Sequence, residues 1–284
     1  MYYLSIMKYS FSSISILVCS CLFFTSMHVC AQVTFQPKPI NYNLKGVVYD
    51  FETTWEGRIF PQGWAVSYRK GRLRSYDRTT YQNFEFGYIR HRQERRHTKP
   101  PIGRSIEGAF GLPSSYIFGK ANQFFNLRYS RGEKHYLSEK TRRKGVAVGW
   151  IYEGGASIGL LKPYYLQVVR TRSDITDQFL ETISYSEELE QDFLDFERIY
   201  GGTSFWKGWD GLTPAIGLHG KLAMHWSMGA FEKKVKAIEA GVMLDIYPQN
   251  IPLIIERDDI KNSNYFLKLY LSFQIGKRKR IGES

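Results

Sequence analysis

Long segments in which apolar and polar residues alternate with a period of two most constrain how this chain can fold. Between Tyr265 and Ile275 every odd-numbered residue is apolar or aromatic, whereas Lys268, Ser272 and Gln274 lie between them. Successive side chains of a strand point to opposite faces, so this segment predicts a strand with one apolar and one polar face. Segments of this kind run for about ten to thirteen residues. That is about twice the length of an ordinary strand, and it fits the roughly 9–11 residues that cross a bilayer.

Eight segments follow this pattern with different strength: 44–57, 63–73, 80–92, 122–131, 145–156, 213–226, 234–246 and 264–276. They predict an all-β fold, an antiparallel transmembrane β-barrel of eight strands. Ten strands are the alternative, if 157–170 and 105–119 also form strands. An eight-stranded barrel is just wide enough for side chains to fill it, so we expect a plugged lumen. A soluble secreted β-sandwich or barrel also alternates, but the long, almost C-terminal last strand favours the membrane barrel.

The N-terminal residues 1–31 have the pattern of a secretory signal peptide. Lys8 precedes an apolar run from Phe11 to Val29, and the small-residue sequence ending at Ala31 suits cleavage. A transmembrane anchor and a lipoprotein are less favoured alternatives, because the run is short and the lipobox is poor. We therefore expect a barrel over residues 32–276 and a basic periplasmic tail over 277–284. All three cysteines lie before residue 31, so the remaining 253 residues (284 − 31) exclude disulfides and thiolate metal sites.

The positive charge of the chain points to anionic lipids. The chain carries 39 Lys and Arg against 27 Asp and Glu, a net charge of +12, and 16% of its residues are aromatic. An exported protein seldom meets nucleic acid, so we expect no nucleic-acid partner. We expect outer-membrane lipids, including lipopolysaccharide, to bind basic residues at the barrel edges. Candidate clusters are Arg90–Arg96 and Lys140–Lys144.

The polar faces of the predicted strands carry charged residues of both signs, as expected of a closed lumen. Buried charges must be paired, so we expect a polar network there. Its predicted members are Asp50, Glu52, His219, Lys221, His225, Glu239, Asp245 and Lys268. The two histidines are six residues apart on one face, about 20 Å, which is too far to bind one metal ion together. We predict no cofactor and no metal site.

The connections between the predicted strands are unequal, and the long ones at 93–121, 157–212 and 247–263 are expected outside the cell. In the longest, Leu189, Phe193 and Phe196 recur at helical spacing among acidic residues, which predicts an amphipathic helix over Tyr185–Tyr200. Candidate lipid-interface or partner-binding residues lie in this loop and in the basic tail. They are Trp206, Trp209, Lys277, Arg278, Lys279 and Arg280.

Four sequence strings resemble a family of small, largely uncharacterised outer-membrane β-barrel proteins of the Bacteroidota. They are Leu160–Leu166 (LLKPYYL), Phe205–Leu212 (FWKGWDGL), Asp245–Pro252 (DIYPQNIP) and Leu269–Arg278 (LYLSFQIGKR). The resemblance covers most of the chain after the signal peptide. It implies a barrel fold and an outer-membrane location, and it brings no catalytic residues.

These observations favour a non-enzymatic integral outer-membrane barrel. We expect a structural protein, or an accessory subunit of an outer-membrane secretion or assembly complex, with other outer-membrane or periplasmic proteins as partners. Two alternatives stay open: a lipid-modifying outer-membrane enzyme that depends on His225, and a small channel. No HExxH, GxSxG or phosphate-binding loop motif is present in the sequence.

Overall fold

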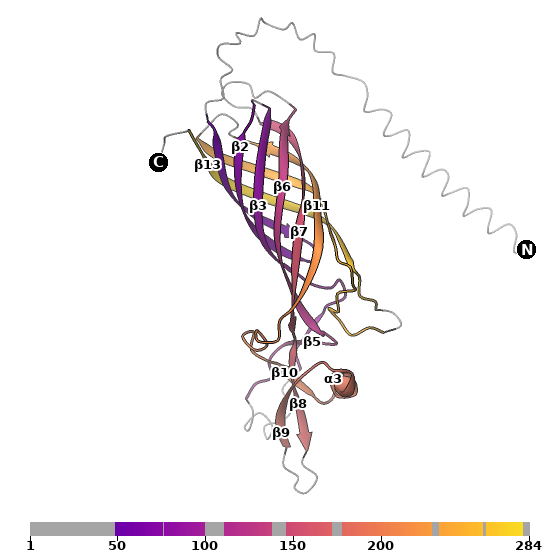
Figure 1. Ribbon diagram of the computed structural model, residues 1–284. Coiled ribbons are helices and arrows are strands. Elements are labelled where there is room, and N and C mark those ends of the chain that lie inside the picture. Colours follow the sequence, from indigo (N-terminus) through magenta and orange to yellow (C-terminus); the bar gives the residue numbers. More distant parts are fainter. Residues whose placement is uncertain are drawn as a thin grey trace, which may run out of the picture. The chain divides into compact units, whose positions relative to one another are not determined.

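A computed structural model describes residues 49–75, 77–99, 111–137, 146–171, 178–228, 233–257 and 260–280. The predicted signal peptide lies outside these residues. Eight strands form a closed antiparallel barrel in the order β1-β13-β12-β11-β7-β6-β3-β2 (Figure 1). Their bounds are β1 Phe51–Phe60, β2 Gly63–Leu73, β3 Arg78–Ile89, β6 Asn122–Tyr136, β7 Ala147–Pro163, β11 Thr213–Ser227, β12 Lys234–Ile246 and β13 Tyr265–Lys279. The predicted all-β, eight-stranded barrel is confirmed.

The ten-stranded alternative is wrong for the described residues. Residues 157–163 continue strand β7, which pairs with β6 and β11 along its length. Pro163 lacks an N–H group and ends the ladder. The chain then leaves the barrel, and Tyr165–Thr171 (β8) pairs with two strands outside the wall.

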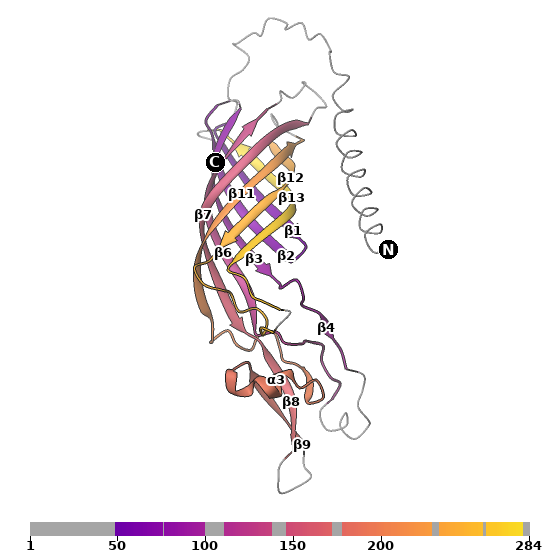
Figure 2. The same ribbon diagram turned by 90° about the vertical axis from the view of Figure 1, so that its right-hand side faces the viewer.

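The connections of the barrel differ strongly between its two ends. The first residue of β1, Phe51, pairs with the last residue of β13, Lys279. We call this end of the barrel the terminal end, and it also holds the connections 74–77, 137–146 and 228–233. The opposite end holds the tight turn at Pro61 and Gln62 and the three long connections 90–121, 164–212 and 247–264, and we call it the loop end (Figure 2). This confirms that the predicted long connections share one end.

The long connections pack together around a hydrophobic cluster of their own, and we call this part of the molecule the cap. It contains the sheet β10-β8-β9, formed by Ile199–Gly202, Tyr165–Thr171 and Gln178–Ser184. It also contains the short pair β4 (Arg96–His97) and β5 (Tyr116–Ile117). All three long connections supply residues to its core, which consists of Tyr116, Ala121, Leu166, Val168, Ile183, Phe193, Ile199 and Ile255.

The predicted helix of the longest connection is present but shorter than expected. A 3-10 turn at Glu187–Leu189 (η3) leads into the helix Glu190–Leu194 (α3). Phe193 is fully buried in the cap core. Asp195 adopts an extended backbone and ends the helix, so Phe196 lies outside it and is 49% exposed.

The outward face of the barrel is a broad apolar surface. Exposed fractions reach 73% for Ile216 and 69% for Leu269, values that a water-soluble wall would rarely repeat on every strand. Aromatic pairs such as Trp55 with Tyr68 span neighbouring strands on this face, with ring centroids 5.1 Å apart. Within the described residues no helix is long and apolar enough to cross a membrane.

Candidate functional site

The inward faces of the strands fill the barrel with buried charged side chains. The carboxylates are Glu52, Glu56, Glu85, Glu153, Glu239 and Asp245, and the cations are Arg58, Arg69, Arg128, Lys134, Lys221, Lys268 and Arg278. Each is at most 5% exposed. Charges buried to this degree are tolerated only when they are paired and hydrogen-bonded, and the structure pairs all of them.

Asp245 is the centre of the network nearest the loop end. Its carboxylate accepts hydrogen bonds from Arg128 Nε at 2.8 Å and from Lys268 Nζ at 2.7 Å. His219, directly opposite on β11, lies with Nδ1 2.8 Å from Asp245 Oδ1. His219 and Asp245 therefore form a cross-strand pair inside the lumen.

Glu239 is the centre of a second group of polar side chains, in the middle of the lumen. Arg69 Nη1 donates to Glu239 Oε2 at 2.9 Å, and Lys221 Nζ lies 3.3 Å from Oε1. Tyr270 and Gln274 also donate to this carboxylate. Glu239 thus holds four neighbours from β2, β11 and β13 around one acid.

Glu52 forms the third group, at the terminal end, and it corrects the predicted tail. Lys134 Nζ donates to Glu52 Oε1 at 2.8 Å, and Arg278 Nε donates to Oε2 at 2.8 Å. Arg278 is not in a tail: it belongs to β13 and is 1% exposed. Its parity is that of Gln274 on the same strand, which is why it points inward. Asp50, expected in the lumen, precedes β1 and is only half-buried.

Lys277 and Lys279 also belong to β13, but they are exposed on the outward face. In the register of the sheet, Lys277 lies opposite Lys234 on one side and Thr53 on the other, and Thr53 lies opposite Lys70. Three outward-facing lysines on β12, β13 and β2 thus lie in one row at the terminal end, with Thr53 of β1 between the last two. Arg280 follows β13, with its guanidinium carbon 5.8 Å from the centre of the Tyr49 ring.

His225, a predicted member of the polar network, forms no hydrogen bond through its ring. It lies opposite Glu239 in the register of β11 and β12, yet neither of its ring nitrogens has a hydrogen-bond partner. The ring is fully buried and meets Tyr136 edge-on, with centroids 6.0 Å apart. A side chain enclosed in this way has no path to a substrate.

His219 also lacks the neighbours that nucleophilic catalysis requires. Its Nε2 atom has no hydrogen-bond partner, and Glu153 Oε1 lies 3.9 Å from it. The hydroxyl of Ser157 is bonded to Tyr247 Oη at 2.7 Å instead. Among the described residues, no hydroxyl is therefore hydrogen-bonded to the Nε2 atom of His219. No cluster of three or more His, Cys, Asp or Glu suited to a metal occurs in the described part of the chain.

The sequence analysis missed about half of the charged lumen. The missed residues are Glu56, Arg58, Arg69, Glu85, Arg128, Lys134 and Glu153. Most lie on β2, β3, β6 and β7, where inward glycines and outward polar residues blur the apolar alternation. The same period of two, applied to charges rather than apolar residues, would have found them.

The predicted interface tryptophans lie at the loop end against the outer wall. Trp209 stacks on Phe125 of β6, with centroids 5.6 Å apart, and Trp206 is 78% exposed beside Phe205. Lys162 Nζ donates to the backbone carbonyl of Phe205 at 2.7 Å and fixes this turn. The arrangement resembles the aromatic girdle at the edge of a transmembrane barrel.

Polar side chains of the cap are partly enclosed by its packing. Lys99 Nζ donates to the carbonyl of Glu197 at 2.9 Å, and burial lowers the pKa of this amine. Burial likewise raises the pKa of Tyr116 and of Tyr164, whose hydroxyl accepts from the Ile117 N–H at 3.1 Å. The cap is therefore a packed unit and not a set of independent loops.

Comparison with known proteins adds little to this description. No family model matches the chain, and no curated protein matches it. Among solved structures, it is similar to Ail, the attachment invasion locus protein of Yersinia pestis, crystallised with the heparin analogue sucrose octasulfate. That match has a TM-score of 0.32 and 10% identity, over 81% of this chain and 95% of the other. The assignment of the barrel depends on the strand pairing itself.

Proposed function

We propose that this protein is a non-enzymatic integral barrel of the bacterial outer membrane. In this proposal its plugged lumen makes the barrel a rigid anchor, and its cap acts outside the cell as a structural or accessory part of a secretion or assembly complex. The observation that carries the proposal is the inverted wall: apolar side chains face outward on the barrel strands, and paired charges fill the inside. Such a wall is stable only when lipid covers it.

The filled lumen supports a structural role over a channel or an enzyme. The ion pairs around Glu52, Glu239 and Asp245 occupy successive levels of the barrel. The histidines that could serve a lipid-modifying enzyme, His219 and His225, are buried among these levels. A solute or substrate would have to break several buried ion pairs to pass, each at a cost of roughly 3–5 kcal/mol.

The cap is the part of the molecule that suits a partner. It is a folded unit built from all three long connections, and its surface exposes large apolar side chains such as Phe179 and Phe196. A barrel that served only to fill the membrane would not need an independent core at its loop end.

The test is a pull-down from mild detergent with a cap that has lost its core. Phe193→Ala removes a fully buried ring from the cap and should cost about 3–5 kcal/mol, enough to loosen the cap. The matched control is Glu187→Ala, which truncates an exposed acid in the neighbouring 3-10 turn. We expect wild type and the control to retain outer-membrane or periplasmic proteins, and Phe193→Ala to lose them with its barrel still folded. Absence of any co-purifying protein with wild type would remove the subunit role.

A further inference from the structure

One part of the barrel wall is shorter than its neighbours at the loop end. The ladder between β1 and β13 ends at Ile59 opposite Leu271, because β1 turns at Pro61. The ladder between β12 and β13 continues to Tyr265. In the described ladders, residues 265–270 of β13 therefore pair with β12 alone, and their other edge faces a gap above the β1–β2 turn. We call this gap the notch.

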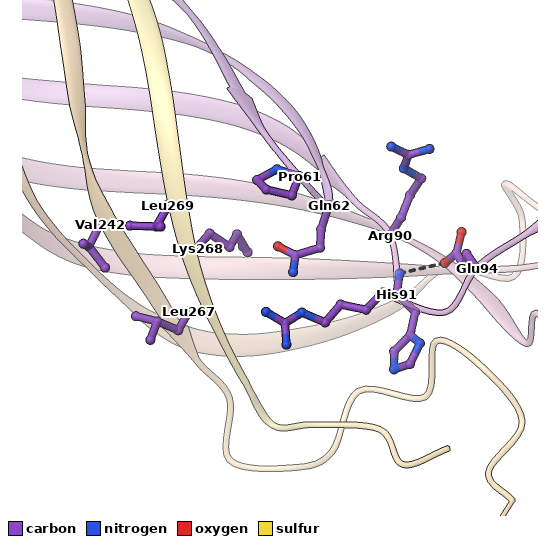
Figure 3. A pocket seen from close by; sticks show the side chains of 10 residues that line it. Pro61, Gln62, Arg90, His91, Glu94, Val242, Leu267, Lys268 and Leu269 are labelled. Carbon is purple, nitrogen blue, oxygen red and sulfur yellow. Dashed lines mark hydrogen bonds between the residues drawn. The ribbon is translucent and has the colours of Figure 1, made fainter. Parts of the chain in front are cut away.

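The notch contains a cavity of about 620 Å³. Its two sides differ in chemistry (Figure 3). On one side are Val242, Leu267 and Leu269, which also belong to the outward apolar face. On the other side lie Gln62 and the segment 90–94, which carries Arg90 and Arg92.

The two arginines of the notch are available to a ligand. Both are exposed, and the structure gives neither guanidinium a carboxylate partner among the described residues. Glu94, the acid nearest in the chain, is already committed to Lys120 Nζ at 2.7 Å, with both side chains buried. Lys268, which also lines the cavity, is paired with Asp245 inside the barrel. The notch therefore presents uncompensated positive charge.

The turn that carries these arginines is fixed in place. The His91 N–H donates to Glu94 Oε1 at 2.9 Å, as Figure 3 shows, and the Glu94 N–H donates to the His91 carbonyl at 3.2 Å. The Arg90 N–H donates to the Gln62 carbonyl at 2.7 Å, which ties the turn to the β1–β2 hairpin. A site whose backbone is held this way loses little entropy when it binds.

The free edge of β13 adds a second requirement for a polar ligand. Alternate residues along an unpaired edge direct their N–H and C=O groups away from the neighbouring strand. At the depth of a membrane, such groups are costly unless something polar covers them. An occupant of the notch must therefore combine anionic oxygens with an apolar tail.

We propose that the notch binds a phosphate-bearing membrane lipid of the leaflet at the loop end. Its phosphate lies between Arg90 and Arg92 and the free edge of β13, and one acyl chain lies along Val242, Leu267 and Leu269. Guanidinium groups bind phosphate with paired, charge-assisted hydrogen bonds. The inference rests on the proposed outer-membrane location, because the apolar side of the notch needs lipid beside it.

The test uses the full chain in phosphatidylcholine nanodiscs and counts retained lipid by native mass spectrometry. The probes are dioleoyl phosphatidic acid, dioleoyl glycerol with the same chains but no phosphate, and inorganic phosphate without chains. We expect only phosphatidic acid to be retained. The double variant of Arg90→Gln and Arg92→Gln should weaken its retention by at least about tenfold, because it removes the charge-assisted hydrogen bonds to the phosphate.

Matched variants distinguish lipid binding at the notch from nonspecific effects of surface charge and surface hydrophobicity. Arg95→Gln removes an exposed arginine just beyond the notch and should leave retention unchanged. Leu267→Ser should weaken retention, whereas Leu222→Ser, at an equally exposed position on β11, should not. Equal retention of phosphatidic acid and dioleoyl glycerol, or binding of inorganic phosphate alone, would overturn the proposal.

Two further outcomes have distinct meanings. A cysteine introduced by Leu267→Cys that cross-links two copies would show a second chain on the free edge of β13 instead of a lipid, and the proposal would be wrong. Failure of the wild-type chain to enter nanodiscs would contradict the outer-membrane function itself, independently of the lipid.

Discussion

The lumen and the notch use the same residue types in opposite ways. In the lumen, Arg128 is surrounded by Glu85 and Asp245 and is 2% exposed. In the notch, Arg90 and Arg92 are exposed and face no described carboxylate. Pairing inside makes a charge structural, because its interactions are already satisfied. Lack of pairing at the rim leaves a charge free to bind something that arrives from outside. Recognition sites in this molecule should therefore be sought where charges are unpaired.

The largest expected effect comes from removing an acid from the centre of the lumen. Glu239→Ala removes one of the two carboxylate partners of Arg69 and of Lys221, and the acceptor of Tyr270 and Gln274, in a buried site. This should lower the free energy of unfolding by roughly 3–5 kcal/mol. The measurement is the urea concentration at which half of the protein in detergent has unfolded. The folded fraction is read from a gel of unheated samples, on which folded and unfolded barrels migrate differently. The control is Glu187→Ala, which removes an exposed acid from the cap. An unchanged midpoint for Glu239→Ala would show that the lumen charges are not structural.

A smaller effect is expected from crowding the lumen. Gly132 faces inward, and a Cβ atom there would lie 2.6 Å from both the Tyr152 carbonyl oxygen and Tyr81 Oη. Gly132→Ala should therefore cost about 1–3 kcal/mol, the usual range for overpacking. Gly220→Ala is the matched control, because nothing lies within 4 Å of the new atom. If both variants unfold at the same urea concentration, the lumen is looser than described.

The smallest effect on stability is expected at the notch. Arg92→Gln breaks no ion pair that the structure shows. Its free energy of unfolding in urea should therefore stay within about 0.5 kcal/mol of wild type. The same variant should still lose lipid, which separates binding from folding. A loss of stability as large as that of Glu239→Ala would mean that the rim arginines belong to the structural network, and the comparison would fail.

The period of two predicted the wall well, and physical reasons explain where it failed. Segments 63–73 and 234–246 match β2 and β12 to the residue, because apolar and polar faces there are exposed to different surroundings. The basic residues from Lys277 onward were predicted to form a tail, which was wrong for Arg278. Arg278 follows Gln274 by four residues, so a continued strand places both side chains on the inward face. The residues of the predicted lumen do lie inside, except Asp50, but alternation alone does not give their partners.

The cap and the notch could not be predicted from local pattern. The core of the cap joins Tyr116, Leu166 and Ile255, which lie far apart in the chain. The first two occur in short strands without clear alternation, and Ile255 lies outside any strand. The notch arises because β1 is shorter than β13 at the loop end. That difference depends on how the strands are staggered around a closed barrel, and stagger is a property of the whole sheet.

Cysteine labelling on one strand tests the central claim, a lipid-covered barrel with a filled lumen. Residues 32–284 contain no cysteine, so single substitutions can be read cleanly. Leu222 and Ala223 are neighbours on β11, the first outward and 59% exposed, the second inward and 5% exposed. In lipid vesicles, a small charged thiol reagent should leave both Leu222→Cys and Ala223→Cys unmodified, and should modify Glu187→Cys on the cap. Rapid labelling of Ala223→Cys would reveal an open lumen, and rapid labelling of Leu222→Cys would contradict the membrane barrel.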